Sequence, residues 1–408
     1  MSKDLHEKAL AYHQEGKPGK LDVTSHKKLD NDQDLSLAYS PGVAAPVREI
    51  VKDQSNVNQY TIKGNLVAVI TDGSAVLGLG NVGPLAAKPV MEGKAVLFKH
   101  FAGINVFNIE LDTQDVDEIV NTIKNIAPTF GGINLEDISA PRCFEIERRL
   151  IDELDIPVFH DDQHGTAIIV AAGLLNALEI QGKSITSAKI VVAGGGSAGI
   201  ATLDLLLNLG FKKENMILVD RRGIVSKEQI SVVNKYKAAY AVDTDKKTLA
   251  DALDGADVFI GVARGNLVTQ KMVKSMAKNP VVFALSNPDP EISVEDVYSS
   301  RDDAVMATGR SDFPNQVNNV LGFPYIFRGA LDANSKIINT EMKVAAVHAI
   351  KDIAKLPVPE SLLEIYKVDE LSFGRDYFIP KPFDPRLIDL IPKAIFDAAV
   401  KTGVARLK

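Results

Sequence analysis

The stretch KIVVAGGGSAGIATLDLLLNLG, residues 189–210, decides the fold of the C-terminal half of this chain. An apolar run enters three glycines and an amphipathic helical pattern leaves them, which is the order that a dinucleotide-binding loop requires. Glycine backbone lets a pyrophosphate come close, and the first amides of the following helix face its charge. A second apolar run, MILVD, ends at Asp220, 21 residues after Gly199, where a carboxylate would bind ribose hydroxyls. The pattern predicts a Rossmann-type domain.

Strand and helix patterns alternate along most of the chain, which is typical of βαβ units around a parallel sheet. Apolar β-rich runs predict strands at 66–71, 104–109, 133–138, 189–193, 216–219, 258–261 and 281–285. Helical patterns occupy 113–125, 143–154, 166–180, 198–209, 227–240 and 387–400. We predict an α/β protein with an N-terminal α/β domain over residues 1–165. A Rossmann-type NAD(P)-binding domain with a parallel sheet follows over residues 166–355, and a C-terminal helical tail over residues 356–408 packs back on the body.

The composition excludes several classes of protein. Of 408 residues, 46 are Lys or Arg and 53 are Asp or Glu, so a formal charge of −7 provides no basic face for nucleic acid or a membrane surface. The single Cys143 excludes a disulfide framework and a cysteine-rich metal site. The longest apolar stretch, 168–178, is shorter than the ~20 residues of a membrane span, and no targeting segment is visible. We expect a soluble, cytoplasmic protein.

A second GxGxxG match, Gly78–Gly83, is the weaker candidate for a nucleotide loop. Residues 72–77 separate it from the preceding strand-like run, and Pro84 follows it directly. We interpret this match as a turn-rich structural loop.

The residues after the MILVD run bear on the choice of dinucleotide. Asp220 slightly favours NAD, because a carboxylate repels a 2′-phosphate. Arg221 and Arg222 follow directly and could bind that phosphate, so NADP is the alternative.

Two acidic pairs flank the predicted domain junction. Glu136-Asp137 ends the strand-like INLEDI, and Asp161-Asp162 lies in PVFHDDQHGT, just before the helix that bridges the domains. Strand ends of an open α/β sheet form the crevice where ligands bind. Carboxylates without a Cys partner suit Mg²⁺ or Mn²⁺ better than Zn²⁺, although flanking histidines would suit a softer metal. The alternative is that such pairs cap helices or lie in solvent.

Four further positions could take part in chemistry. Lys94, between a glycine and a strand-like apolar run, could be desolvated into a general base, or could be an ordinary surface lysine. Tyr39 precedes a Ser-Pro-Gly turn that could hold its phenol over a pocket, or could be a core tyrosine. Asn287 and the Asn318-Asn319 pair could orient a carboxylate or carboxamide, or simply make turns.

These segments together resemble the malic enzymes, especially the short bacterial type. The resemblance runs from LAYSPGVA to YIFRGAL, roughly three quarters of the chain. Its most specific elements are AYSPGVA, GLGNVG, MEGKAVLF, LEDI, HDDQHGTA, AGGGSAG, FALSNP and NNVLGFPYIFRGAL, in the expected order. The resemblance implies oxidative decarboxylation of (S)-malate to pyruvate and CO₂ with reduction of NAD(P)⁺, with oxaloacetate decarboxylation as a further activity. It also implies a homodimer, and it makes GLGNVG part of the substrate- and metal-binding N-terminal domain.

Roles for individual residues follow from the same resemblance. Tyr39 would be the general acid and Lys94 the general base, with Asp161 close by to orient Lys94. The divalent metal, Mg²⁺ or Mn²⁺, would be bound by Glu136, Asp137 and Asp162. The dinucleotide would contact Gly194, Gly195, Gly196, Ser197, Ala198, Gly199, Asp220 and Asn287. Malate would contact Lys94, Asn287 and Asn319.

One departure and three rival functions bear on this assignment. Eukaryotic-type enzymes carry an arginine shortly before GLG that binds a malate carboxylate, whereas this chain reads DGSAVLGLG, with Ser74 and Ala75. Lys94, the asparagines or backbone N–H groups would then have to bind the carboxylate. The rivals are another lysine-using dehydrogenase, a malolactic-type enzyme that releases lactate, and a non-catalytic NAD-binding regulator. Metal dependence and product analysis separate them.

Overall fold

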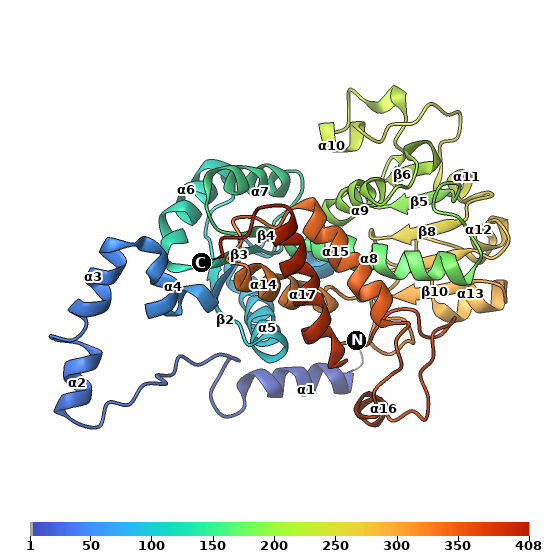
Figure 1. The fold of residues 1–408 in the computed structure, drawn as a ribbon. Helices are drawn as coiled ribbons and strands as arrows, with labels where there is room; N and C mark the ends of the chain where they lie inside the picture. Colours follow the sequence, from blue (N-terminus) through green and yellow to red (C-terminus); the bar gives the residue numbers. More distant parts are fainter. Residues whose placement is uncertain (1–2, 408) are drawn as a thin grey trace.

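The computed structural model describes residues 3–407, apart from the side chain of Leu77. Two sheets occupy different halves of this part of the chain (Figure 1). The first is parallel, in the order β2-β1-β3-β4, and the second has the order β10-β9-β8-β5-β6-β7 and is parallel except for β7. The strands of the first are β1 (Leu66–Thr71), β2 (Asn105–Glu110), β3 (Gly132–Leu135) and β4 (Val158–His160). Those of the second are β5 (Ile190–Ala193), β6 (Met216–Asp220), β7 (Gly223–Ile224), β8 (Val258–Gly261), β9 (Val281–Ala284) and β10 (Val305–Thr308). The predicted α/β class and Rossmann-type sheet are confirmed.

Strand order places the ligand crevice. In the second sheet β6 follows on one side of β5 and β8 on the other, so a crevice opens beyond the carboxyl end of β5, at the glycine loop. In the first sheet Leu135 of β3 pairs with His160 of β4. The residues that follow these two partners therefore leave the sheet side by side, which brings both acidic pairs to one edge.

Helix α8 (Asp161–Ile180) joins the two halves. It begins directly after β4 of the first sheet and packs against α9 (Ser197–Asn208) and β9 of the second. Most of its residues are buried on all sides, as expected for a helix in the centre of a protein. The helix predicted at 166–180 thus starts five residues earlier, because the carboxylates of Asp161 and Asp162 suit a helix N-terminus and form its first turn.

The chain returns to the first half after the second sheet. Helix α14 (Phe323–Asp332) packs on α5 (Pro84–Ala102), where the Phe98 ring lies 4.7 Å from that of Phe323. Helix α15 (Thr340–Ile353) packs on α8, and α17 (Arg386–Lys401) packs on α14 and α15. The other helices of the body are α6 (Val116–Ile126), α7 (Arg142–Glu153), α10 (Lys235–Ala238), α11 (Leu249–Leu253), α12 (Gln270–Ser275), α13 (Val294–Ser300) and α16 (Glu360–Tyr366).

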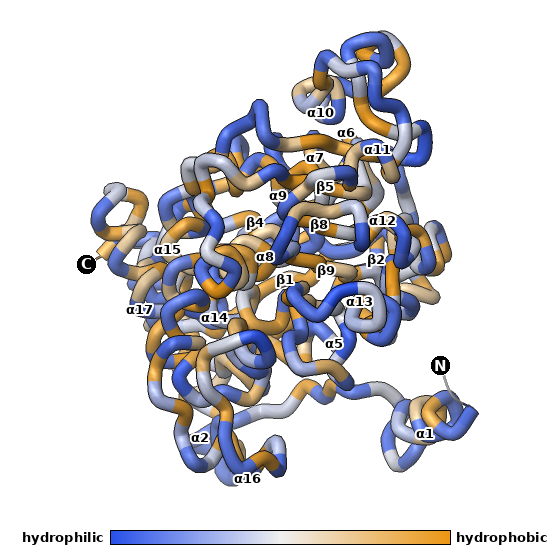
Figure 2. The backbone as a smooth tube through the Cα atoms, turned by 90° about the vertical axis from the view of Figure 1, so that its right-hand side faces the viewer, coloured by the Kyte–Doolittle hydropathy of each residue, from blue (hydrophilic) through white to orange (hydrophobic). Residues whose placement is uncertain are grey.

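The N-terminal region lies outside this body. Its helices are α1 (Lys3–Gln14), α2 (Asp32–Ala38), α3 (Ala44–Lys52) and α4 (Val57–Tyr60), and none of them has a buried residue. Helices α2 and α3 project from the body as an arm, residues 32–52 (Figure 1). By contrast, Figure 2 shows the central strands β5, β8 and β9 largely in the hydrophobic colours.

Two local predictions are wrong. The run with Lys94 lies within helix α5, which begins with Pro84 at its first turn and ends at Gly103 in the left-handed conformation. The helix predicted at 227–240 is only a 3₁₀ turn followed by the short α10, because Asn234 accepts the amides of Tyr236 and Lys237 and starts a new helix there. Among the described residues, the helices are too short or too polar to cross a membrane.

Candidate active site

A cleft of about 580 Å³ lies between the carboxyl ends of the two sheets. The first sheet and its helices contribute Lys94, Glu136, Asp137 and Asp162, and the second contributes the glycine-loop residues Ser197 and Ala198. Asn287, Asn318 and Asn319 also line it. A larger cavity of about 1520 Å³, between residues 50–65 and α14, contains none of the predicted site residues. The smaller cleft is therefore the candidate site.

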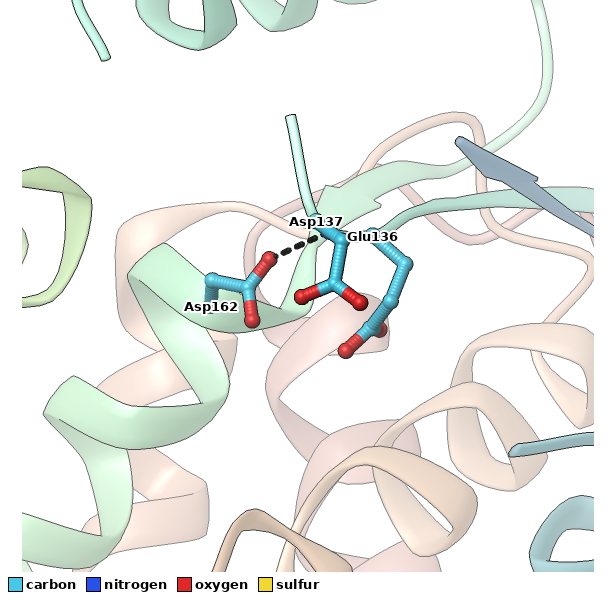
Figure 3. Close-up of side chains that lie close together, drawn as sticks. All are labelled: Glu136, Asp137 and Asp162. Atoms are coloured by element: carbon cyan, nitrogen blue, oxygen red, sulfur yellow. Dashed lines mark hydrogen bonds between the residues drawn. The ribbon is translucent and has the colours of Figure 1, made fainter. Parts of the chain in front are cut away.

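Three carboxylates meet at one side of the cleft (Figure 3). Glu136 and Asp137 follow β3, Asp162 lies in the first turn of α8, and one oxygen of each lies within 4.8 Å of the others. The Asp137 amide donates to Asp162 Oδ2 at 2.7 Å. Asp137 has φ 53°, in the left-handed region, and this turn lets adjacent side chains converge that would diverge on a strand.

Burial shapes the charge of this cluster. It raises the pKa of Glu136 to about 7 and that of Asp162 to about 6, although Lys94 partly opposes both shifts. Burial likewise raises the pKa of Asp161, which is fully buried, to about 7. Oxygen donors with excess negative charge fit a hard divalent cation such as Mg²⁺ or Mn²⁺. His160 and His164 do not belong to the three-carboxylate cluster.

Lys94 lies in the middle of α5 and is 8% exposed. Its ammonium pairs with Asp161 and, at 3.1 Å, with Glu136, and it lies 4.3 Å from the centre of the Phe323 ring. Burial alone would lower the pKa of Lys94, as the sequence suggested. The Asp161 and Glu136 carboxylates outweigh burial and raise the pKa above its ordinary value, so the predicted lowering is wrong for the protein without a metal.

The glycine loop lies across the cleft from this cluster. Gly194 has φ 122°, and a Cβ there would come within 2.6 Å of the Val262 carbonyl oxygen, so only glycine fits. Helix α9 begins at Ser197 and directs its free amides towards the cleft. The loop therefore has the backbone geometry that binds a pyrophosphate.

Sequence analysis missed Lys237. It donates to Asp220 Oδ2 at 2.9 Å, and its Cε would lie 2.7 Å from a Cβ on Gly195. Lys237 and the Arg222 amide hold the pKa of Asp220 below its usual value, against the opposing effect of burial. The signal for Lys237 was weak, because it lies in a helix of four residues, 17 positions after Asp220.

Arg264, also missed, lines the cleft in the loop after β8. Arg264 is exposed. Among the described residues that line the cleft, Lys94 and Arg264 are the two with cationic side chains. The weaker glycine match reaches the same cleft, where a Cβ on Gly78 would lie 2.9 Å from the Asn287 carbonyl oxygen.

Tyr39 lies apart from these residues. It ends α2 at the tip of the arm, its side chain is 71% exposed, and it does not line the cleft. The Ser-Pro-Gly turn therefore does not hold this phenol over a pocket of its own chain.

Comparison with known proteins gives a consistent result over both halves of the chain. Residues 18–151 match the family described as malic enzyme, N-terminal domain, and residues 163–373 match that described as malic enzyme, NAD binding domain. The NADP-dependent malic enzyme of Halomonas elongata is 58% identical over 98% of this chain and 94% of its own length. The bifunctional malic/malolactic enzyme of Bacillus subtilis is 52% identical over 99% of this chain and 95% of its own.

Other relatives are longer. The NAD-dependent malic enzyme of Rhizobium meliloti is 53% identical over 99% of this chain and 52% of its own length. The chain likewise spans about half the length of several further curated relatives. The crystal structure of malic enzyme from Pyrococcus horikoshii has a TM-score of 0.90 at 42% identity, covering 99% of this chain and 92% of that one.

Proposed function

The chain belongs to the malic enzyme family, and we propose that it oxidatively decarboxylates (S)-malate to pyruvate and CO₂ while reducing NAD(P)⁺, with Mg²⁺ or Mn²⁺ as the metal. One observation supports this most: the carboxylates and Lys94 of one sheet face the glycine loop of the other across a single cleft. Metal, proton acceptor and dinucleotide can therefore meet one small substrate. Oxaloacetate would be decarboxylated in the same site.

Glu136, Asp137 and Asp162 are the residues that would hold the metal. Their three oxygen donors lie close together. The negative charge of these carboxylates exceeds the single positive charge of the Lys94 ammonium. When bound, the cation supplies a Lewis acid next to the C2 oxygen of the substrate.

Lys94 Nζ would take the proton from the C2 hydroxyl. Asp161 binds this ammonium and is itself bound by the Asn319 amide, so a chain of buried hydrogen bonds orients Nζ. Glu136 and Asp162 help to raise the pKa of Lys94, and the charge of a cation bound to them would offset that effect. A neutral Lys94 is then available as the general base.

The glycine loop would bind the pyrophosphate and place the nicotinamide, which accepts the hydride, next to Lys94 and Asn287. Asn287 lies beyond β9 on the second sheet, and Asn319 precedes α14, so the two amides approach the cleft from different elements. Arg264 would bind a malate carboxylate in place of the arginine absent before GLGNVG.

Tyr39 would protonate C3, but it must come from a second copy of the chain. We therefore propose a homodimer in which each arm reaches the partner's cleft. The arm carries large apolar side chains that are 50% exposed or more: Leu35, Leu37, Tyr39, Val47 and Val51. An apolar surface of this kind marks an interaction site.

Both dinucleotides remain candidates, and the structure adds an argument for NADP⁺. Asp220 alone would repel a 2′-phosphate, but Lys237 pairs with it, and Arg221 and Arg222 lie beside it in the sequence. We expect NADP⁺ to bind at least as well as NAD⁺.

The proposed boundaries at residues 165 and 355 also remain predictions. Helix α8, which starts at Asp161 and extends into the second half, is compatible with the first boundary. Similarly, α17 packs on α14 and α15, as expected for a tail that packs back on the body.

The decisive test is the formation of NAD(P)H from L-malate with Mn²⁺, with and without EDTA, together with identification of the product. Metal-dependent NAD(P)H and pyruvate would support the proposal. Because the Bacillus subtilis relative is a bifunctional malic/malolactic enzyme, lactate is the second product to assay. Lactate without net NADH would indicate the malolactic reaction, and no product at all would contradict both.

A further inference from the structure

Two loops of the second sheet lie together at the cleft. Strands β8 and β9 are parallel neighbours, and each continues at its carboxyl end into a loop that lines the cleft. The loop after β8 contains Ala263 and Arg264, and the loop after β9 contains Ser286 and Asn287. The relative position of these loops sets the shape of the cleft on its dinucleotide side.

Glu291 lies later in the loop after β9, before α13, and its side chain joins this loop to the loop after β8. Its Oε1 accepts from the Ala263 amide at 2.9 Å and from Ser286 Oγ at 2.6 Å, and its Oε2 accepts from the Ser286 amide at 3.1 Å. The residue is completely buried and does not line the cleft. A Cβ on Gly261, the last residue of β8, would lie 2.4 Å from the Glu291 carboxyl carbon, so the carboxylate sits directly against the strand end.

Burying a carboxylate at this position costs free energy. Among residues 3–407 no lysine, arginine or histidine forms an ion pair with Glu291, and burying an unpaired charge costs free energy that an apolar side chain would avoid. Three donors offset that cost, and they belong to two different loops. Backbone hydrogen bonds from Asn266 to Pro290 and from Val268 to Glu291 also join the loops. What the Glu291 side chain adds, and an apolar side chain would lack, is a bond next to the cleft, at Ala263 and Ser286.

We propose that Glu291 is a positioning residue for dinucleotide binding: it fixes the loops after β8 and β9 so that Ala263 and Asn287 face the cleft in register. This rests on the proposed function, in which the cleft binds NAD(P)⁺. Glu291 touches neither dinucleotide nor malate and acts through the loops it binds. The acidic cluster lies on the other sheet and does not depend on it.

The test is Glu291→Gln, measured as the Kd for NADP⁺ and NAD⁺ by calorimetry and the Kd for Mn²⁺ without dinucleotide. An amide of the same size accepts through one oxygen and turns its NH₂ group towards a backbone N–H donor, so either the Ser286 amide or the Ala263 amide loses its acceptor. We expect dinucleotide affinity to fall about ten-fold, because a hydrogen bond to a charged group is lost, with Mn²⁺ affinity unchanged. Ser286→Ala, which removes only the hydroxyl donor, should have a smaller effect in the same direction.

The matched control is Asp257→Asn. Asp257 lies at the amino end of β8, opposite the carboxyl end that faces the cleft. Asp257 also bridges segments through a carboxylate, accepting from the Lys189 amide at 2.8 Å and from Lys183 Nζ at 2.5 Å. This variant should lose thermal stability but keep its dinucleotide affinity. Equal losses in both variants, an unchanged dinucleotide Kd in Glu291→Gln, or a parallel loss of Mn²⁺ binding would each overturn the proposal. If the Glu291 proposal fails in this way but the wild-type protein makes NAD(P)H from malate, the proposed function still holds.

Discussion

The two sheets present their carboxyl ends to one cleft, but with opposite chemistry. The first sheet contributes buried charged side chains, whereas the second contributes backbone amides from a glycine loop. Backbone dipoles need no counter-ion, so the edge formed by the second sheet is complete without a ligand. The carboxylates of the other edge have raised pKa values and lie around a single lysine. One half of the site is therefore preformed, while the other is poised for a cation.

The largest effect is expected at the charged edge, from Lys94→Met. Removal of the general base should lower kcat by about 10²–10⁴-fold while dinucleotide affinity stays the same. The matched control is Lys88→Met on the same helix, where Lys88 forms a surface pair with Glu110. Steady-state kinetics and a dinucleotide titration measure both effects, and an unchanged kcat would remove Lys94 from the chemistry.

Tyr39 belongs to neither sheet, and its variant tests the third contributor to the site. Tyr39→Phe should lower kcat by about 10²–10⁴-fold, as expected for loss of a general acid. Mixing it with Lys94→Met under conditions that exchange subunits should restore about a quarter of wild-type activity, because half of the dimers then hold one intact shared site. Absence of recovery would place Tyr39 and Lys94 on the same subunit.

Asp162→Asn tests whether the charged edge binds a cation. A ligand lost from a site of three carboxylates should weaken Mn²⁺ binding by about 100-fold or more, since even outer groups contribute 10–100-fold. Dinucleotide binding, which depends on the other edge, should persist. The control Asp152→Asn changes an exposed carboxylate on α7. A normal Mn²⁺ titration would contradict the ligand assignment.

A smaller effect is expected at the backbone edge, from Lys237→Gln. Loss of this cation leaves Asp220 without its ion-pair partner, so the ratio of kcat/KM for NADP⁺ to that for NAD⁺ should fall about ten-fold, the value of one charged hydrogen bond. Lys235→Gln on the same short helix is the control, since Lys237 and not Lys235 pairs with Asp220. An unchanged ratio would exclude Lys237 from dinucleotide selection.

The smallest effect is on the stability of the metal-free protein. Glu136 and Asp161 have a pKa of about 7 when folded, against the ordinary value of about 4 when unfolded. Between these values the folded state binds more protons, so stability is highest at low pH and declines as pH rises from about 4 to 7. In EDTA, Tm should fall by a few degrees over this interval. Glu136→Gln should make Tm depend less on pH. A wild-type Tm that rises with pH over this interval would contradict the prediction.

Sequence patterns identified most of the fold because the signals were local. The strand at Leu66–Thr71 and the strand at Val258–Gly261 have the predicted bounds, since continuous apolar runs are typical of buried parallel strands. The helix containing Lys94 was mistaken for a strand because MEGKAVLF has an apolar run of β-like composition. Its N-terminal Pro84 and C-terminal Gly103 were the signals that indicated a helix.

The sequence by itself determined the α/β class and the nucleotide loop, because glycine spacing and strand ends are properties of short segments. The resemblance to the malic enzymes singled out Glu136, Asp137 and Asp162 among the acidic residues, and the structure brings these three together. Only the tertiary structure decided the charge on Lys94, the pairing of Asp220 with Lys237, the bridge made by Glu291 and the exposure of Tyr39. Each of these depends on residues far apart in the chain that packing brings together. Burial and distance in space determine a pKa or a partner, and neither is encoded in a local pattern.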